Sequence, residues 1–262
     1  MNLEVITKRL VASLKESGGF IRKEFETFSS DKIEKKGRYN NLVSYVDKQA
    51  EEMLVESLTE IFPEAGFVTE ENTTSIGKKE YNWIIDPLDG TTNFMHGLPI
   101  FCTTAALMKG DEVLSGVVLD PMRSEVFYSW KGGGAWLNNT RLHVTNTTTI
   151  EDSLIITGFP YDLKGHTEKY YALLQKFTNR CHGVRRLGSA ALDMAYVAGG
   201  RAEAFFEYNL NIWDIAAGIL LVEEAGGKVT DFSGGNKHLE AIEVLAAGKV
   251  HSELLKVIKE NW

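Results

Sequence analysis

The chain has 262 residues, 44% hydrophobic and 24% charged, which is typical of a globular protein with a sizeable core. Its formal net charge of −8 argues against a general nucleic-acid or membrane-surface binder, because such proteins usually present a basic face. Two cysteines are too few for a disulfide framework, and no apolar stretch approaches the about 18 residues of a membrane span. The first residues lack the apolar core of a signal peptide, so the chain is expected to be cytoplasmic.

The first sixty residues are predicted to form two helices that flank a polar segment. Apolar residues recur at helical spacing over 3–27, interrupted at Gly18-Gly19, and again over 44–61. Residues 33–44 between them are interpreted as a hairpin or a mobile loop. The basic residues of this segment, either solvated or in contact with a ligand, are Lys35, Lys36 and Arg38.

Two short apolar strands are then predicted to end in acidic residues. Glu70 follows the strand at 67–69, and Asp86 follows the strand at 83–85. If these strands are neighbours, both acids lie at one edge of a sheet, where ligands tend to collect. Buried carboxylates need a compensating positive charge, and hard divalent cations prefer carboxylate and carbonyl oxygens.

The turn after the second strand has features suited to an anion. Pro87 stiffens the chain between Asp86 and Asp89, and Gly90 allows a ligand to approach the backbone closely. Residues 91–93 supply N-cap chemistry for a following helix, whose N-terminus favours negative charge. A metal and an anion at one turn indicate phosphate chemistry.

The rest of the chain changes from β structure to alternating strands and helices. Residues 101–145 are predicted to hold strands at 103–108, 112–119 and 125–130. Gly132-Gly133-Gly134 lacks the Walker spacing and is interpreted as a hairpin turn. The elements expected after that are strands at 153–157, 184–187, 202–206, 228–230 and 243–247, and helices at 167–177, 190–197, 212–225 and 251–258.

No internal repeat or low-complexity linker divides the chain, so residues 1–262 are expected to form a single domain, with a lobe boundary near 145–152.

Asp214 lies near the start of the helix at 212–225, where the helix dipole alone could explain an acid. Together with Glu70, Asp86 and Asp89, it makes four acids at strand ends or helix starts. With the Leu88 carbonyl, they supply enough oxygens for two hard cations.

Two motifs carry a resemblance to a known family. The sequence DPLDGTTNF at 86–94 and the sequence WDIAAG at 213–218, followed by EEAGG at 223–227, resemble the two signatures of the inositol monophosphatase family. The resemblance covers essentially the whole chain, and the spacing of Glu70 fits it. It implies an α/β (α+β) fold, a layered α-β-α-β-α sandwich of the inositol monophosphatase and fructose-1,6-bisphosphatase type. It also implies a Mg²⁺-dependent, lithium-sensitive phosphomonoesterase that forms a homodimer.

The resemblance further implies roles for individual residues. Two or three Mg²⁺ ions per active site would be held by Glu70, Asp86, the Leu88 carbonyl, Asp89 and Asp214. Thr91 and Glu70 would orient the attacking water, with Asp47 supporting Thr91. The backbone N–H groups of Gly90 and Thr91 would bind the phosphate, and Gly188, Ser189, Ala190 and Glu207 would contact the alcohol part of the substrate. Asp89 and Asp214 would also take part in substrate binding. Asn40-Asn41 stand where many relatives carry an acid, which puts third-metal support from that loop in doubt.

The substrate stays open at this stage. Inositol 1-phosphate, cleaved to inositol and phosphate, is the first expectation, since Glu207 suits a polyol. The alternatives are a phosphatase of fructose 1,6-bisphosphate, histidinol phosphate, NADP or a 3′-phosphoadenosine nucleotide, because the motifs handle phosphate and metal rather than the leaving group. The modest length and the lack of a basic substrate patch count against the bisphosphates. A regulatory role with RNA or the transcription machinery is a further alternative, although the net charge of −8 opposes nucleic-acid binding.

Overall fold

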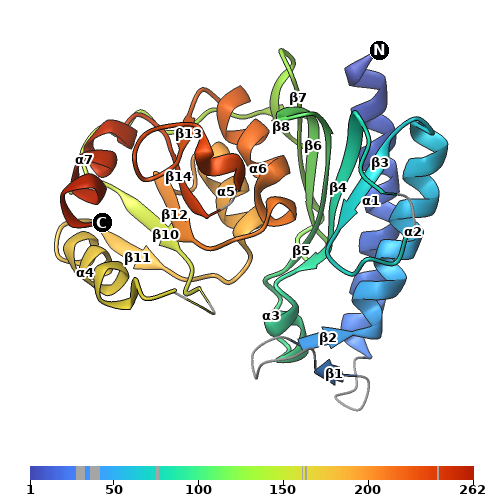
Figure 1. Ribbon diagram of the computed structural model, residues 1–262, viewed down its shortest axis with the longest axis horizontal. Coiled ribbons are helices and arrows are strands. Elements are labelled where there is room, and N and C mark those ends of the chain that lie inside the picture. Colours follow the sequence, from blue (N-terminus) through green and yellow to red (C-terminus); the bar gives the residue numbers. More distant parts are fainter. Residues whose placement is uncertain (28–32, 36–41, 75–76, 161, 163, 241) are drawn as a thin grey trace.

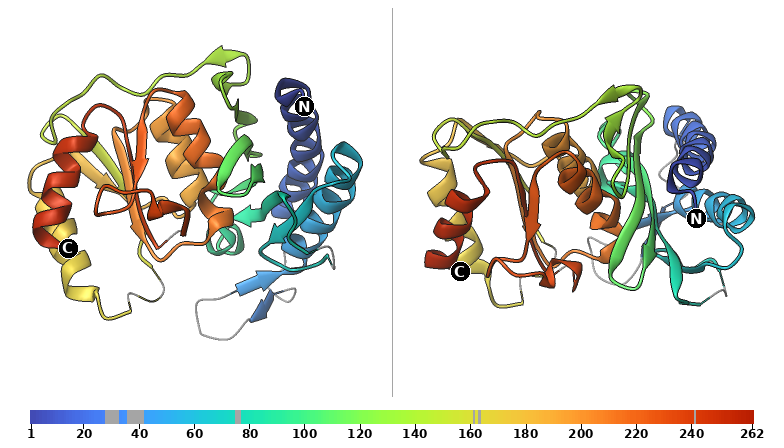
Figure 2. Two further views of the ribbon diagram at one scale, coloured as in Figure 1. Left: turned by 45° about the horizontal axis from the view of Figure 1, so that its top comes forward. Right: turned by 90° about the horizontal axis from the view of Figure 1, so that it is seen from above.

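The computed structural model describes residues 1–27, 33–35, 42–74, 77–160, 162, 164–240 and 242–262, with only the backbone described at 33–35 and 42–44. Its helices and sheets form five layers (Figures 1 and 2). Helices α1 (Leu3–Glu26) and α2 (Tyr45–Ile61) cover the outer face of a seven-stranded sheet. Helices α5 (Ala190–Ala198) and α6 (Ile212–Glu224) lie between it and a five-stranded sheet, whose outer face is covered by α4 (Thr167–Thr178) and α7 (His251–Asn261). The predicted α-β-α-β-α sandwich is therefore confirmed.

The seven-stranded sheet is built almost entirely from consecutive antiparallel strands. In spatial order these are β3 (Gly66–Thr69), β4 (Tyr81–Asp89), β5 (Cys102–Lys109), β6 (Glu112–Asp120), β7 (Glu125–Trp130), β8 (Gly134–Leu137) and β9 (Thr140–Arg141). Only β3 and β4 run parallel, so the ends of these two strands meet at one edge of the sheet.

The five-stranded sheet is mixed. Its spatial order is β11 (Gly183–Arg185), β10 (Leu154–Thr157), β12 (Ala204–Tyr208), β14 (Glu243–Ala247) and β13 (Lys228–Thr230). The remaining short elements are α3 (Thr91–Met95), the 3₁₀ helix η2 (Lys237–Glu240) and the antiparallel pair β1 (Ile33–Lys35) and β2 (Leu42–Ser44).

The helix α6 is buried between the two sheets, and its sequence explains why. All residues from Ile215 to Val222 are buried, so this helix is apolar on every side. It packs with α5 in the largest cluster of buried hydrophobic residues, which also includes side chains from both sheets. The charged start of α6, which carries Asp214, thus sits on a firmly packed element.

All the predicted helices and strands are found, with some differences in their bounds and character. Strand β4 continues through Pro87 to Asp89 instead of ending at Ile85, and Glu207 lies inside β12 instead of after it. The N-cap of α3 is Gly90, whose φ is 98°, and not one of residues 91–93. The strands β8 and β9 were not expected. The hairpin interpretation is confirmed for the paired backbone of 33–35 and 42–44, whereas the Lys35 side chain and residues Lys36, Arg38, Asn40 and Asn41 lie outside the described parts.

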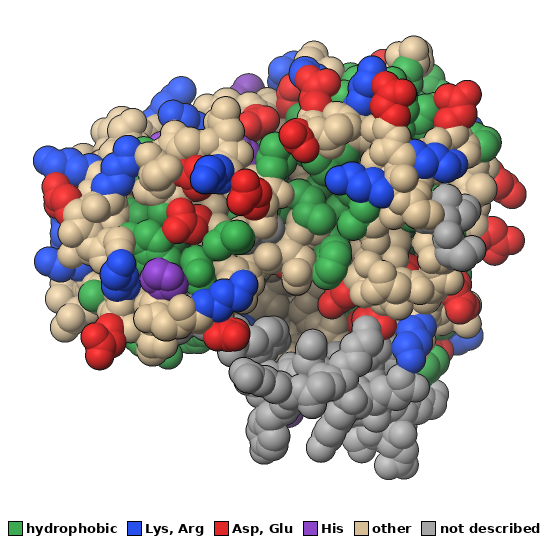
Figure 3. Space-filling view, viewed as in Figure 1, with side chains coloured by type: hydrophobic (Ala, Val, Ile, Leu, Met, Phe, Trp, Pro, Cys, Tyr) green, Lys and Arg blue, Asp and Glu red, His purple; other side chains and the backbone are tan. Residues whose placement is uncertain are grey.

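The surface carries charges of both signs. On the face shown in Figure 3, Lys and Arg side chains are interspersed with Asp and Glu side chains instead of gathering in one patch. Within the described residues, no helix combines the length and apolar character needed to cross a membrane.

Candidate active site

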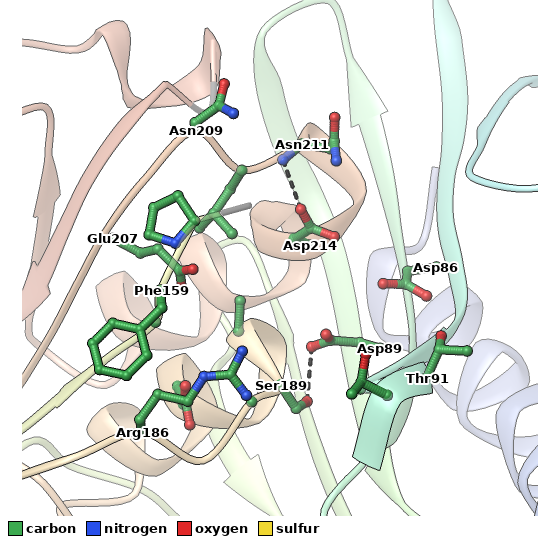
Figure 4. Close-up of a pocket in the computed structure, with 18 of the residues that line it drawn as sticks. Asp86, Asp89, Thr91, Phe159, Arg186, Ser189, Glu207, Asn209, Asn211 and Asp214 are labelled. Atoms are coloured by element: carbon green, nitrogen blue, oxygen red, sulfur yellow. Dashed lines mark hydrogen bonds between the residues drawn. The ribbon is translucent and has the colours of Figure 1, made fainter. Parts of the chain in front are cut away.

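A bulge in β4 brings two aspartates to the same side of the sheet. Asp86 pairs with Thr104 of β5, and Asp89 pairs with Cys102, so three residue steps on β4 match two steps on β5. In a regular strand, side chains three residues apart point to opposite faces. The one extra residue therefore lets both carboxylates face the same space, as Figure 4 shows.

Glu70 lies beside Asp86 because β3 and β4 are parallel neighbours. Thr69 pairs with Ile85, and the backbone N–H of Glu70 donates to the Ile85 carbonyl at 3.3 Å. Burial, and then the charge of the neighbouring Glu70, raise the pKa of Asp86 well above its usual value. The expectation that these two acids meet at one sheet edge is confirmed.

Asp89 connects the first sheet to helix α5. Its Oδ2 atom accepts hydrogen bonds of 2.7 Å from the Ser189 hydroxyl and 2.7 Å from the Ala191 backbone N–H. Ser189 is the N-cap of α5, but its own side chain makes no capping hydrogen bond. Asp89, from a strand about a hundred residues earlier in the chain, therefore caps this helix.

Asp214 reaches the same space from α6. It is the third residue of that helix, and its Oδ2 atom accepts a 2.6 Å hydrogen bond from the backbone N–H of Asn211, which closes a capping box (Figure 4). Asp86, Asp89 and Asp214 thus come together from two elements that the sequence separates widely.

Thr91 stands at the start of α3, next to these acids. Its hydroxyl lies 3.1 Å from Oδ1 of the buried Asp47 on α2 and 2.9 Å from the Leu88 carbonyl oxygen, either of which can accept its proton. The neighbouring Asn93 donates through Nδ2 to the Leu187 carbonyl at 2.8 Å. That bond ties α3 to the segment that precedes Gly188.

These residues surround one cavity of about 320 Å³. On one side it is lined by Glu70, Asp86, Leu88, Asp89, Gly90 and Thr91, and on the other by Gly188, Ser189, Ala190 and Glu207, with Asp214 between. Of the predicted site residues only Asp47 is not in the lining, because it stands behind Thr91. Among the described lining residues seven are acidic and one, Arg186, is basic.

Burial, together with the charges of neighbouring acids, raises the pKa values of the carboxyl groups in the cavity. Burial, and then the charges of Asp214, Asp47 and Glu71, raise the pKa of Glu70 to about 8. Burial and the charge of Asp89 raise the pKa of Asp214 to about 7. Burial raises the pKa of Asp89 only to about 6, since hydrogen bonds from Ser189 and Ala191 favour its charged form. Burial, followed by the charge of Asp214, also raises the pKa of Glu207 to about 8.

Such a cluster of oxygens suits a divalent cation. The charges that act on Glu70, Asp86 and Asp214 are all negative and raise their pKa values, so the chain itself supplies these acids with little compensation. Four carboxylates and one carbonyl are the ligand types that Mg²⁺ prefers. In the described parts of the chain, however, no three acidic, histidine or cysteine side chains are already arranged around one point. A cation bound here would therefore be accompanied by movement of some of these carboxylates towards one point.

Sequence reasoning did not single out several residues of this region. Arg186 and Asp193 both line the cavity, and Asp193 is almost fully buried, with its Oδ1 atom lacking a partner within the described residues. Only the closeness of Arg186 to Gly188-Ser189 could have suggested a site. Glu51, a buried acid one helical turn after Asp47, carried a usable signal, because residues four apart share a helix face.

Known proteins resemble this chain over nearly its full length. The profile of the inositol monophosphatase family matches residues 2–262. An inositol-1-monophosphatase of Mesorhizobium japonicum is 38% identical over 253 residues, which cover 96% of this chain and 95% of that protein. A putative Nus factor SuhB of Neisseria meningitidis serogroup B is 45% identical over 226 residues, or 85% of this chain and 86% of that protein. The crystal structure of the extragenic suppressor protein suhB from Bartonella henselae has a TM-score of 0.93 at 36% identity, covering 98% of this chain and 100% of that chain.

Proposed function

The chain belongs to the inositol monophosphatase family, and on that premise we propose that it hydrolyses inositol 1-phosphate to inositol and phosphate with the help of Mg²⁺. The observation that carries the proposal is the meeting of Glu70, Asp86, Asp89 and Asp214 at one cavity whose described lining holds a single basic side chain. An excess of buried carboxylates beside a cavity of about 320 Å³ suits metal ions and a small phosphate ester.

We infer that two or three Mg²⁺ ions are held by Glu70, Asp86, the Leu88 carbonyl, Asp89 and Asp214. Bound there, such cations would neutralise phosphate charge and polarise the phosphoryl group. The positions of the carboxylates support this assignment, because Asp86 and Asp89 lie on β4, Asp214 lies on the buried helix α6, and Glu70 directly follows β3.

We infer further that Thr91 and Glu70 orient the attacking water. The Thr91 hydroxyl can donate its proton to the buried Asp47 at 3.1 Å or to the Leu88 carbonyl at 2.9 Å, and either bond leaves its lone pairs for a water proton. Glu70 lines the same cavity as Thr91 and Asp86. In this proposal the backbone N–H groups of Gly90 and Thr91 contact the phosphate.

The other side of the cavity is assigned to the alcohol. Glu207 is only 8% exposed and lines the cavity together with the Gly188–Ala190 segment. A carboxyl group with a pKa of about 8 can both donate and accept hydrogen bonds near neutral pH, which suits a polyol with several hydroxyls.

A phosphate-release panel tests the proposal. Inositol 1-phosphate, fructose 1,6-bisphosphate, histidinol phosphate, NADP and adenosine 3′,5′-bisphosphate are each incubated with the protein and Mg²⁺, with and without Li⁺. We expect inositol 1-phosphate to be hydrolysed most efficiently and Li⁺ to inhibit. Faster hydrolysis of another ester would move the substrate assignment to that alternative, and no hydrolysis of any ester would reject the enzyme proposal.

A second candidate function rests on the similar protein that is named a putative Nus factor SuhB. That name favours the regulatory, transcription-associated role as an alternative in which catalysis is secondary. The net charge of −8 favours a protein partner over direct nucleic-acid contact. The Asp89→Asn variant separates the two roles, because a regulatory function would survive the loss of hydrolysis.

We also propose that the protein is a cytoplasmic homodimer and that residues 1–262 fold as one domain.

A further inference from the structure

Glu51 of α2 is a fully buried acid that the proposed reaction does not use. Its Oε2 atom accepts a 2.8 Å hydrogen bond from the backbone N–H of Glu71. Its Oε1 atom accepts hydrogen bonds from the backbone N–H of Thr73 at 2.7 Å and from the Thr73 hydroxyl at 2.8 Å. A buried carboxylate is costly unless its oxygens are hydrogen-bonded, and these three donors satisfy both of them.

The segment that Glu51 holds begins directly after Glu70. On its other side, Glu70 is held by the bond from its backbone N–H to the Ile85 carbonyl of β4. Asn72 has a φ of 54°, a sharp local turn that lets residues on either side of it reach one carboxylate. The backbone of Glu70 is therefore held between strand β4 on one side and helix α2 on the other. Neither of these bonds involves the Glu70 carboxylate itself.

The same helix also holds the other half of the proposed water site. Asp47 lies four residues before Glu51, so both acids face the same side of α2. Asp47 Oδ1 lies 3.1 Å from the Thr91 hydroxyl, while Glu51 holds the chain after Glu70. Two successive turns of α2 thus set the relative position of Thr91 and Glu70.

We propose that Glu51 is a positioning residue, which tunes the affinity of the cavity for divalent cations by fixing the backbone that carries Glu70. This inference rests on the proposed assignment of Glu70 as a metal ligand. Replacing Glu51 by Gln turns one acceptor oxygen into an NH₂ group that would face a backbone N–H. The hydrogen bond to either Glu71 or Thr73 is then lost. Partners that orient a metal ligand typically contribute about 10-fold to 100-fold to metal affinity.

The test compares Mg²⁺ binding, measured by calorimetry without substrate, in the wild type and in Glu51→Gln. We expect the Mg²⁺ concentration for half-saturation to rise by about 10-fold. In assays, the half-maximal Mg²⁺ concentration should rise equally, while kcat at saturating Mg²⁺ returns close to the wild-type value. Glu224→Gln is the matched control, because the Glu224 oxygens likewise accept two backbone N–H groups at 2.7 Å, from Gly132 and Gly134, outside the cavity lining. Its Mg²⁺ half-saturation should stay unchanged.

The outcomes separate the two proposals. A folded Glu51→Gln protein with wild-type Mg²⁺ affinity overturns the positioning role and leaves the phosphatase proposal intact. A wild-type protein that binds Mg²⁺ but hydrolyses no phosphate ester rejects the phosphatase proposal, and the calorimetric comparison still decides the role of Glu51. If circular dichroism shows that Glu51→Gln is unfolded, Thr73→Ala removes just the hydroxyl bond. An unchanged Mg²⁺ half-saturation in that milder variant overturns the inference, and a rise of about 2-fold to 3-fold supports it.

Discussion

Asp89 of β4 caps helix α5: its Oδ2 atom accepts a 2.7 Å hydrogen bond from the backbone N–H of Ala191. One side chain thus serves the fold and, in the proposed function, the metal site. The two contributions can be separated by substitution, because an Asn side chain keeps an oxygen that can cap a helix but loses the negative charge.

We predict that Asp89→Asn folds normally and loses hydrolysis, with turnover reduced by at least about 1000-fold if charge on the metal ligand is essential. Asp89→Ala should lose hydrolysis equally and also lose the cap, at a cost of about 1 kcal/mol in the free energy of unfolding relative to Asp89→Asn. Denaturant titrations and phosphate-release assays at saturating Mg²⁺ measure the two effects. Near-wild-type turnover in Asp89→Asn would contradict the assignment of Asp89 as a ligand.

Removal of Mg²⁺ is predicted to destabilise the protein more at high pH than at low pH. The raised pKa values of Glu70, about 8, and Asp214, about 7, mean that the metal-free folded state holds protons that the unfolded chain has already released. The stabilisation that these bound protons give to the folded state is complete below the unfolded-state pKa values of 4.5 for Glu70 and 3.8 for Asp214. It is lost as the pH rises through the folded-state pKa values of about 8 and about 7. Bound Mg²⁺ compensates the ionised carboxylates instead.

The midpoint temperature of thermal unfolding should therefore differ little between EDTA and millimolar Mg²⁺ near pH 6, and clearly near pH 8. These two pH values lie on either side of the Asp214 pKa of about 7. In Asp214→Asn, which removes one of the repelling charges, the midpoint in EDTA should fall less steeply with pH. An equal Mg²⁺ effect on the wild type at both pH values would contradict this prediction.

Gly158 is predicted to control the position of Glu207. A Cβ atom at residue 158 would overlap the Glu207 carboxyl group, which is buried and has little room to move. Gly158→Ala should therefore displace Glu207 and raise KM for a polyol phosphate by about 10-fold, with a smaller change in kcat, if Glu207 binds the alcohol. Gly19→Ala, where a Cβ atom meets nothing within 4 Å, is the control. An unchanged KM in Gly158→Ala would argue against the alcohol site at Glu207.

His251, at the start of α7, is predicted to make the fold sensitive to acid. It is 4% exposed, its Nε2 lies 3.0 Å from the Thr230 hydroxyl, and burial lowers its pKa from 6.5 to about 4. A lowered pKa means that the stabilisation is complete above pH 6.5 and is lost as the pH falls towards 4, by on the order of 3 kcal/mol. Denaturant titrations across this range should show a steeper loss of stability in the wild type than in His251→Gln. Parallel pH profiles would show that another group is responsible.

The sequence was informative wherever a residue's neighbours in the chain determine its structure. Helical spacing predicted α1 and α2, the apolar run at 212–225 predicted α6, and the paired acids after two apolar strands predicted the meeting of Glu70 and Asp86. Relationships between distant segments left no such local signal. The hydrogen bond from Ala191 to Asp89 joins residues about a hundred positions apart, and β12 extends past Glu207 because its partner β14 pairs with it up to Tyr208. Both depend on the three-dimensional packing of whole elements.

Pro87 shows how the bulge of β4 can exist inside a buried strand. A proline normally interrupts a sheet because it has no N–H to donate, but Pro87 lies in the bulge, where the ladder to β5 needs no donor. The next N–H, of Leu88, donates to the Asp86 side chain at 2.9 Å, so the irregular backbone leaves no buried donor there without a partner. Pro87→Ala would add such a donor and should lower the free energy of unfolding by about 1–3 kcal/mol, as denaturant titration can measure. The bulge that brings Asp86 and Asp89 to one side of the sheet is thus favoured because Pro87 has no backbone N–H that would need a partner.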